Sequence, residues 1–154
     1  TAAIFGQFNN ILNPPETTQF TFGDLSTKDF YGVVFNRARL RERMEAGGWE
    51  LHLKNGATGP VVKLIDDSST NKGGNTGQRN FAPEYNIVSG TLVGGTDIDT
   101  AAASEGATGT YGKFYPSVGV LILNPTKLAD PSNLNLVTVS GSNSDDRNNE
   151  KLYN

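Results

Sequence analysis

The chain has a single histidine, so His52 is the only imidazole that could act as the general base of a nucleophilic site. It belongs to a strictly alternating segment, residues 49–54, which predicts a strand with apolar side chains on one face. The alternation places His52 beside Glu50 and Lys54 on the polar face, where a solvated histidine is commoner than a catalytic one. No Gly-x-Ser-x-Gly motif accompanies it. We therefore predict no catalytic residue and no enzymatic activity.

The glycine-rich segment over residues 106–113 invites comparison with a phosphate-binding loop. Such a loop needs a glycine five residues before its Gly-Lys pair, but Ala107 occupies that position. Phe114 stands where a magnesium-binding hydroxyl is required, and the segment leads into a predicted strand rather than a helix. The sequence predicts a glycine-rich loop here.

Oxygen-bearing side chains alternate from Asp67 to Asn71, as they do in a calcium-binding loop. Lys72 replaces the turn glycine of that motif, and Gln78 replaces its closing glutamate. Other carboxylate pairs lie in loop or tail sequence, where solvated acids are the default: Asp66 and Asp67, Asp97 and Asp99, Asp145 and Asp146. We predict no metal site, no cofactor and no glycosidase pair.

Two groups of side chains are candidates for a subunit interface. Arginines recur at every second position on a predicted helix, and they form either a solvated face paired with Glu42 and Glu45 or a docking face for an acidic neighbour. Phenylalanines recur along an N-terminal arm, which packs either on its own domain or on a neighbouring subunit. The candidate interface residues are Arg37, Arg39, Arg41, Arg43, Phe5, Phe8, Phe20 and Phe22.

Three tyrosines could face a ligand, since aromatic rings beside polar groups suit sugar recognition. They are Tyr85, Tyr111 and Tyr115. The simpler interpretation is that they pack within a sheet.

The elements that would position these residues are mostly strands. A helix is expected from Arg37 to Ala46, with Asn36 as its N-cap and Gly47 as its stop. A brief helical turn is expected after Asn124. Strands are expected at residues 19–22, 31–35, 49–54, 61–65, 85–88, 110–115, 118–123 and 134–140, with a hairpin joining 49–54 to 61–65.

Composition supports a β-rich class. The 154 residues are 19% charged and 36% hydrophobic and include 18 glycines, a mixture that favours turns and strands over long helices. The net charge of −3 gives no electrostatic reason to expect nucleic acid or an anionic membrane as a partner. With no cysteine, disulfides and thiolate metal sites are excluded.

We therefore predict a mostly β protein, an antiparallel sandwich or barrel-like sheet with one short helix over residues 37–46. It would comprise an extended N-terminal arm (1–29), a β-rich domain (30–140) and a polar C-terminal tail (141–154).

Three segments stand out together: FNRARLRER (35–43) with GGWELHL (47–53), YNIVSGT (85–91) and YGKFYPSVGVLILN (111–124). In this order they resemble virion structural proteins of contractile-tailed (myovirus-type) phages, especially those infecting marine cyanobacteria. The similar region runs from about Phe30 to Leu128. None of these motifs is catalytic. The resemblance implies a structural part of a virion, in the tail, baseplate, neck or fibre, assembled in the host cytoplasm. It also implies that such segments occur within longer proteins.

Two functional hypotheses follow. The first is a virion component that acts by contacts with other virion proteins or with copies of itself. The alternative is a carbohydrate- or receptor-binding β-module that contacts a glycan on the host surface.

Overall fold

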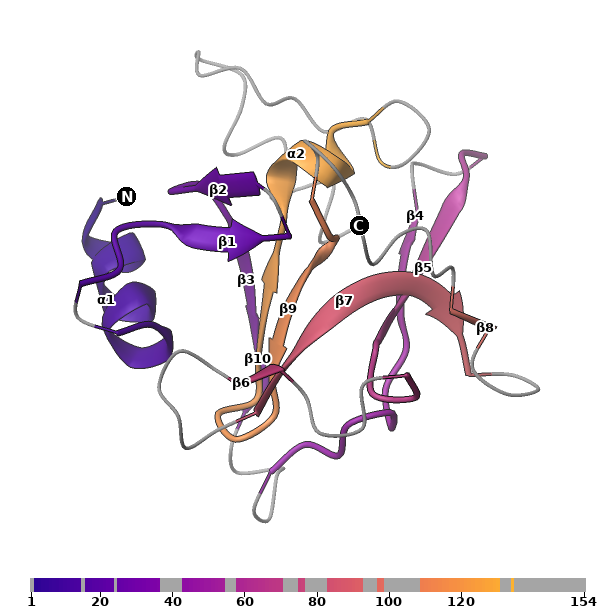
Figure 1. Cartoon of the computed structure of the whole chain (residues 1–154). Coiled ribbons are helices and arrows are strands. Elements are labelled where there is room, and N and C mark those ends of the chain that lie inside the picture. The colour runs from indigo at the N-terminus through magenta and orange to yellow at the C-terminus, as the bar shows by residue number, and fades with distance from the viewer. Residues whose placement is uncertain are drawn as a thin grey trace.

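The computed structural model describes residues 2–14, 16–23, 25–36, 43–54, 58–70, 75–76, 83–92, 97–98, 109–130 and 134. Over these residues the fold is mostly β, with antiparallel pairing throughout and a main sheet that curls into a half-barrel (Figure 1). The predicted fold class is confirmed. The domain boundaries stay a prediction, and residues 141–154 lie outside the described part.

The main sheet has the strand order β3-β10-β9-β7-β5-β4. Its strands are β3 (Tyr31–Val34), β4 (Leu51–Lys54), β5 (Val61–Asp66), β7 (Pro83–Thr91), β9 (Gly112–Tyr115) and β10 (Val120–Leu123). Two short strands, β6 (Asn75–Thr76) and β8 (Asp97–Ile98), pair with the long β7. Outside this sheet lie the helices α1 (Ala2–Leu12) and α2 (Pro125–Leu128) and a small hairpin of β1 (Phe20–Phe22) and β2 (Leu25–Thr27).

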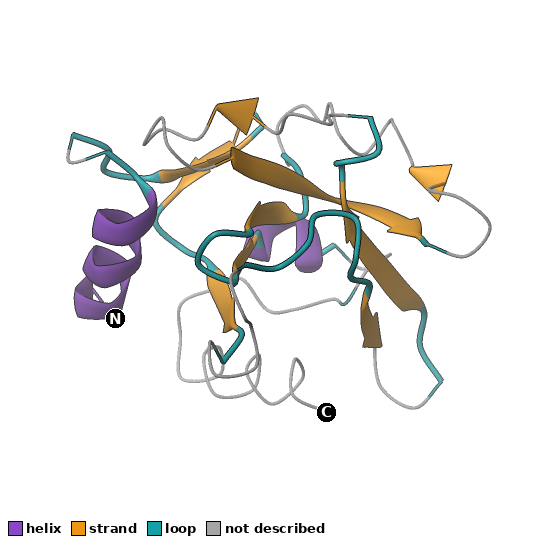
Figure 2. Cartoon of the chain, turned by 90° about the horizontal axis from the view of Figure 1, so that it is seen from below, coloured by secondary structure: helices purple, strands orange, loops and turns teal. Residues whose placement is uncertain are grey.

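Every residue of the central strands β9 and β10 is buried, so both faces of the sheet need a cover. The larger core lies on one face, where Phe114 and Leu121 pack with side chains from β4, β5 and β7 and with Leu128 of α2. The smaller core lies on the other face, where Val120 and Ile122 pack under α1 and the β1–β2 hairpin. Figure 2 shows α1 at one side of the molecule and the short α2 nearer its middle.

The N-terminal segment differs from the extended arm that we predicted, because Ala2–Leu12 forms a helix. Phe5, Phe8 and Leu12 share one face of this helix at helical spacing and join the smaller core. The ring of Phe30 lies 5.4 Å from that of Phe8 and 5.1 Å from that of Phe20, both in edge-on geometry. The strand predicted at residues 19–22 is confirmed as β1. This segment is a cover for the sheet.

The helix predicted over residues 37–46 is wrong in its last part, since Arg43 to Ala46 are not helical. The Met44 N–H donates to the carbonyl oxygen of Pro116 at 3.1 Å, which ties this segment to the β9–β10 turn. Met44 and Ala46 also pack against the larger core. Tertiary packing therefore overrides local helix propensity here. Residues 37–42 lie outside the described part of the chain.

Two local predictions are confirmed. The β4–β5 hairpin pairs Leu51 with Leu64. Asn124 caps α2: its Oδ1 accepts bonds from the N–H groups of Thr126 and Lys127, while its Nδ2 donates to the carbonyl of Thr110 at 2.8 Å. Asn124 is fully buried and so links the helix to the approach of β9. For the strand predicted at 134–140, Leu134 is described as a turn and the rest lies outside the described residues.

Two glycine substitutions test this architecture. Gly109 has φ +66°, and a Cβ there would lie 1.9 Å from the carbonyl oxygen of Phe22, so we expect Gly109→Ala to lower the free energy of unfolding by about 2–4 kcal/mol. Gly6 lies within α1, and a Cβ there would meet no atom within 4 Å, so Gly6→Ala should raise it by about 0.5–1 kcal/mol. Urea unfolding of both variants gives the comparison. A Gly6→Ala variant with unchanged or reduced stability would contradict a helical N-terminus.

Candidate functional site

The three tyrosines predicted to face a ligand are buried. Tyr85 and Tyr111 belong to the larger core, and Tyr115 belongs to the smaller one. The prediction that these tyrosines are exposed is wrong for all three. The sheet is covered on both faces here, so the aromatic rings pack in the cores.

One of them, Tyr85, does reach the wall of a hollow of about 630 Å³. Arg43 lines the same hollow, together with Pro83 and Pro116. The structure thus brings together one predicted interface arginine and one predicted ligand-facing tyrosine. Arg37, Arg39 and Arg41 lie outside the described residues.

The predicted interface phenylalanines also turn inward. Phe20 and Phe22 are buried, which contradicts their assignment to a subunit interface. Phe5 and Phe8 are half-buried, and their rings pack against the other phenylalanines of the smaller core. The N-terminal aromatics therefore pack on their own domain.

Instead, α1 exposes two isoleucines that the sequence analysis did not select. Ile4 is 50% exposed and Ile11 is 59% exposed, seven residues apart on the same side of the helix. A shallow hollow of about 530 Å³ lies beside Ile11, lined by Gln7, Phe8, Asn10 and Ile11. The helix has no charged residue. Its outer side is therefore apolar or neutral, which is unusual for a helix on a protein surface.

Among the described residues, β3 lies next to α1 at one edge of the main sheet. Gly32 and Val34 are exposed on it, and Val34 is 59% exposed. The opposite edge strand, β4, carries His52 and Lys54 on its exposed side. A charged side chain such as Lys54 protects an edge from pairing with another chain, and β3 has no charged residue. We call Ile4, Ile11, Gly32 and Val34 the α1–β3 surface.

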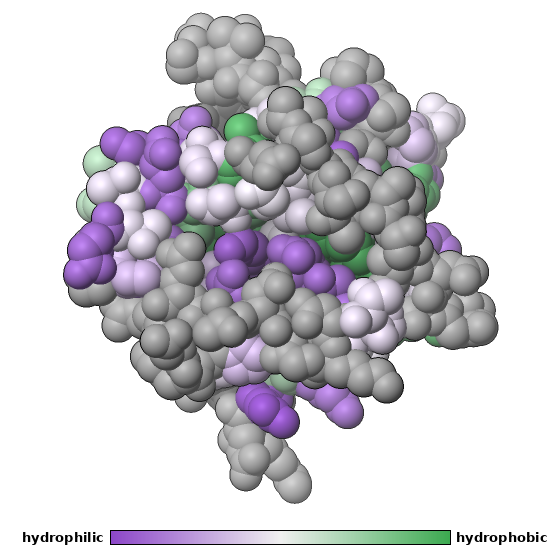
Figure 3. Space-filling model, viewed as in Figure 1, coloured by the Kyte–Doolittle hydropathy of each residue, from purple (hydrophilic) through white to green (hydrophobic). Residues whose placement is uncertain are grey.

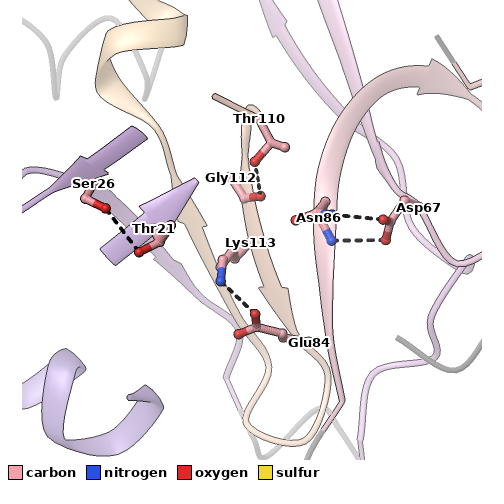
Figure 4. A network of polar contacts seen from close by, with 8 residues as sticks. All are labelled: Thr21, Ser26, Asp67, Glu84, Asn86, Thr110, Gly112 and Lys113. Atoms are coloured by element: carbon pink, nitrogen blue, oxygen red, sulfur yellow. Dashed lines mark hydrogen bonds and ion pairs between the residues drawn. The ribbon is translucent and has the colours of Figure 1, made fainter. Parts of the chain in front are cut away.

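A buried polar row crosses the same sheet face as the smaller core (Figure 4). Lys113 Nζ on β9 donates to Glu84 Oε1 on β7 at 2.6 Å, and both side chains are buried. Figure 3 shows hydrophilic residues gathered near the middle of the face turned to the viewer. Next to the Lys113–Glu84 ion pair, the Tyr115 hydroxyl and Glu84 Oε2 are buried without a hydrogen-bond partner in the described structure. Burial, reinforced by the Glu84 carboxylate, raises the pKa of Tyr115.

The row continues to Asp67, which accepts two bonds from Asn86, one from its backbone N–H at 3.0 Å and one from its side chain at 3.1 Å. Burial raises the pKa of Asp67, while the bonds from Asn86 oppose that rise. Asp66 accepts bonds from the N–H groups of Gly47 and Ser68. Asp66 is the last residue of β5, Asp67 follows it, and both are buried, so our assignment of them to a solvated loop is wrong.

Glu50, just before β4, links that strand to the end of β7 by hydrogen bonds. Its Oε2 accepts bonds from the N–H of Leu92 at 2.8 Å and the hydroxyl of Thr91 at 3.1 Å, and its Oε1 contacts His52 Nε2. The bond from Leu92, together with the one from His52, lowers the pKa of Glu50 from 4.5 to about 2. His52 is thus engaged at an exposed strand edge.

Among the residues that the structure describes, no cluster of three or more histidine, cysteine, aspartate or glutamate side chains could hold a metal ion. The Asp97 side chain and Asp99 lie outside that set. No helix within the described ranges has the length and apolar character to cross a membrane. No family model matches the chain, and no curated protein or solved structure matches it either.

The buried ion pair makes a specific prediction about stability. Lys113→Met leaves the Glu84 carboxylate buried and unpaired, so we expect the free energy of unfolding to fall by about 3–5 kcal/mol. The double variant Lys113→Met/Glu84→Met removes both charges and should recover most of that loss. Chemical denaturation of the two variants measures the difference. Equal losses in both would mean that the pair is not the source of the effect.

Glu50 predicts a pH dependence. Because its pKa is lowered on folding, Glu50 contributes stability that is fully present above about pH 4.5 and is lost as the pH falls toward 2. Glu50→Gln should therefore flatten the curve of unfolding free energy against pH between about 4.5 and 2. Glu16→Gln, which removes an exposed carboxylate, is the matched control. A curve for Glu50→Gln that parallels the unsubstituted chain across this window would contradict the prediction.

Proposed function

We propose that this chain is a structural component of a phage virion, in its tail, baseplate, neck or fibre, and that it acts through subunit–subunit contacts. The observation that carries the proposal is the α1–β3 surface, where exposed apolar side chains lie on two uncharged elements side by side. The resemblance of the chain to virion proteins of contractile-tailed phages agrees with this role.

The chemistry of that surface suits a protein partner. Exposed apolar residues scattered singly are ordinary, but here Ile4 and Ile11 repeat along one side of a helix that has no charge. Depletion of charge at the centre of the contact is what distinguishes protein interfaces from the remaining surface. Other virion proteins, or further copies of this chain, are the partners that we propose.

The interior of the molecule suits a scaffold. The two cores and the buried polar row hold their side chains in mutual contact, and the buried carboxylates of Asp66 and Asp67 are occupied by N–H donors. Such groups fix shape. The proposed site of action is the assembled particle outside the cell, after assembly in the host cytoplasm.

The alternative hypothesis, a glycan- or receptor-binding module, has less support. It depended on three exposed tyrosines, and all three are buried. What favours it is the hollow that both Tyr85 and Arg43 line. Sugar sites generally need a broader aromatic platform, so we place assembly first.

The test is the composition of the particle and its dependence on α1. Quantitative mass spectrometry of purified virions should find the chain at a fixed copy number. A chain carrying Ile11→Lys, supplied during infection, should enter particles about tenfold less, because a charge in an apolar contact is costly. Val61→Lys is the matched control, since Val61 is 47% exposed on β5, away from α1.

Ile11→Lys changes an exposed helix side chain, so it should alter folding stability by no more than about 0.5 kcal/mol. Val61→Lys faces Lys54 across the β4–β5 pair, so it should cost up to about 1 kcal/mol without touching α1. Particles that lack the chain would overturn the virion proposal. Equal incorporation of Ile11→Lys and Val61→Lys would overturn the role of α1 in it.

A further inference from the structure

We propose that two copies of this chain pair through β3, antiparallel and about a two-fold axis at Val33, so that the main sheet of one copy continues into the next. This inference rests on the proposed function, because it names the partner of the α1–β3 surface as a second copy. It is argued from backbone direction, register and charge.

The backbone direction follows from the bonding of β3 to its inner neighbour. The N–H of Phe35 donates to the carbonyl of Gly119 at 2.9 Å, just beyond the β3–β10 ladder. Peptide groups alternate in direction along a strand, so Val33 also bonds toward β10. The N–H and C=O groups of Gly32 and Val34 then point away from β10, toward the outer edge of the sheet.

A two-fold axis at Val33 brings these outward groups into register. In an antiparallel pair centred there, Gly32 of each copy lies opposite Val34 of the other, and each such pair exchanges two N–H···O=C bonds. The two copies of Val33 face each other at the axis as a non-hydrogen-bonded pair. All of the outward peptide groups of Gly32 and Val34 are satisfied by one contact.

The side chains fit the same register. Val34, at 59% exposure, is among the most exposed apolar side chains in the described structure. In the pair it lies opposite a glycine, on the sheet face that α1 covers. A Cβ on Gly32 would already be 3.5 Å from the Phe8 ring, so the space above Gly32 ends at an apolar wall. Val34 of one copy can therefore cover Gly32 of the other and contact its Phe8.

Charge decides between the two edges of the sheet. Pairing two β4 strands would bring the exposed Lys54 of both copies to the contact, and like charges close together destabilise a sheet. The β3 strand, Tyr-Gly-Val-Val, carries no charge, and neither does α1 beside it. For a chain with a net charge of −3, this is a surface on which two copies can meet without repulsion.

Light scattering coupled to size-exclusion chromatography of the whole chain at micromolar concentration tests the pairing. We expect twice the chain mass of 16.5 kDa. Val34→Lys should raise the dissociation constant at least about tenfold, because it places a charge at the new strand pair. Val61→Lys should leave it unchanged.

Crosslinking tests the register, because the native chain has no cysteine. Val33→Cys should form an intermolecular disulfide in an oxidising glutathione buffer at least about tenfold faster than Lys54→Cys, since pairing holds the two thiols at a high effective concentration. Circular dichroism of each variant checks that it is folded, and Val34→Lys tests the pairing independently if Val33→Cys is not.

A monomer at these concentrations would overturn the inference while leaving a virion role through other partners intact. The inference would also be overturned by a dimer whose dissociation constant is unchanged by Val34→Lys and in which Val33→Cys crosslinks no faster than Lys54→Cys. Such a dimer would have its contact elsewhere. Absence of the chain from virions would remove the proposed function but not a dimer measured in solution.

Discussion

The burial of both faces of β9 and β10 is the constraint on which the rest of the molecule depends. Each of these strands is covered on two sides, so the sheet cannot be stable as one half of a simple sandwich with a wet outer face. One cover is the curl of the sheet itself with Leu128 of α2. The other is recruited from the N-terminus, where α1 and the β1–β2 hairpin bring aromatic rings onto Val120 and Ile122. The inner side of the N-terminal segment therefore packs on its own domain, while its outer side stays apolar.

Much of the sheet could be predicted from the sequence because its signals are local. Alternation in residues 49–54 and the turn that follows define the β4–β5 hairpin, and Asn124 followed by Pro125 defines the start of α2. The N-terminal helix also left a signal, since Phe5, Phe8 and Leu12 have helical spacing. Gly6 and the paired Asn9 and Asn10 weakened it, and only the sheet surface beneath makes that helix favourable. The opposite error arose at Arg43 to Ala46, where helix-forming residues are held by the β9–β10 turn instead.

The candidate site was less predictable, because exposure depends on contacts between distant parts of the chain. Nothing near Lys113 reveals that its partner is Glu84, 29 residues earlier, or that the pair is buried. Tyr85, Tyr111 and Tyr115 have the kind of local sequence that surrounds ligand-contacting tyrosines, and only the closure of the two cores shows that they face inward. Conversely, Ile4 and Ile11 look like core residues by type, yet they are exposed. Residue type alone therefore predicts exposure for side chains that are buried and burial for side chains that are exposed.

The placement of Asn124 has a consequence for how the molecule comes apart. One fully buried side chain holds the carbonyl before β9, directly follows β10 and closes the first turn of α2. If one of these elements moves, the Asn124 side chain loses a hydrogen bond and its hold on the other elements weakens. The three elements should therefore open together. The β9–β10–α2 corner should therefore behave as a single cooperative unit whose backbone amides exchange with solvent at nearly the same free energy, while the ends of β4 and α1 fray independently.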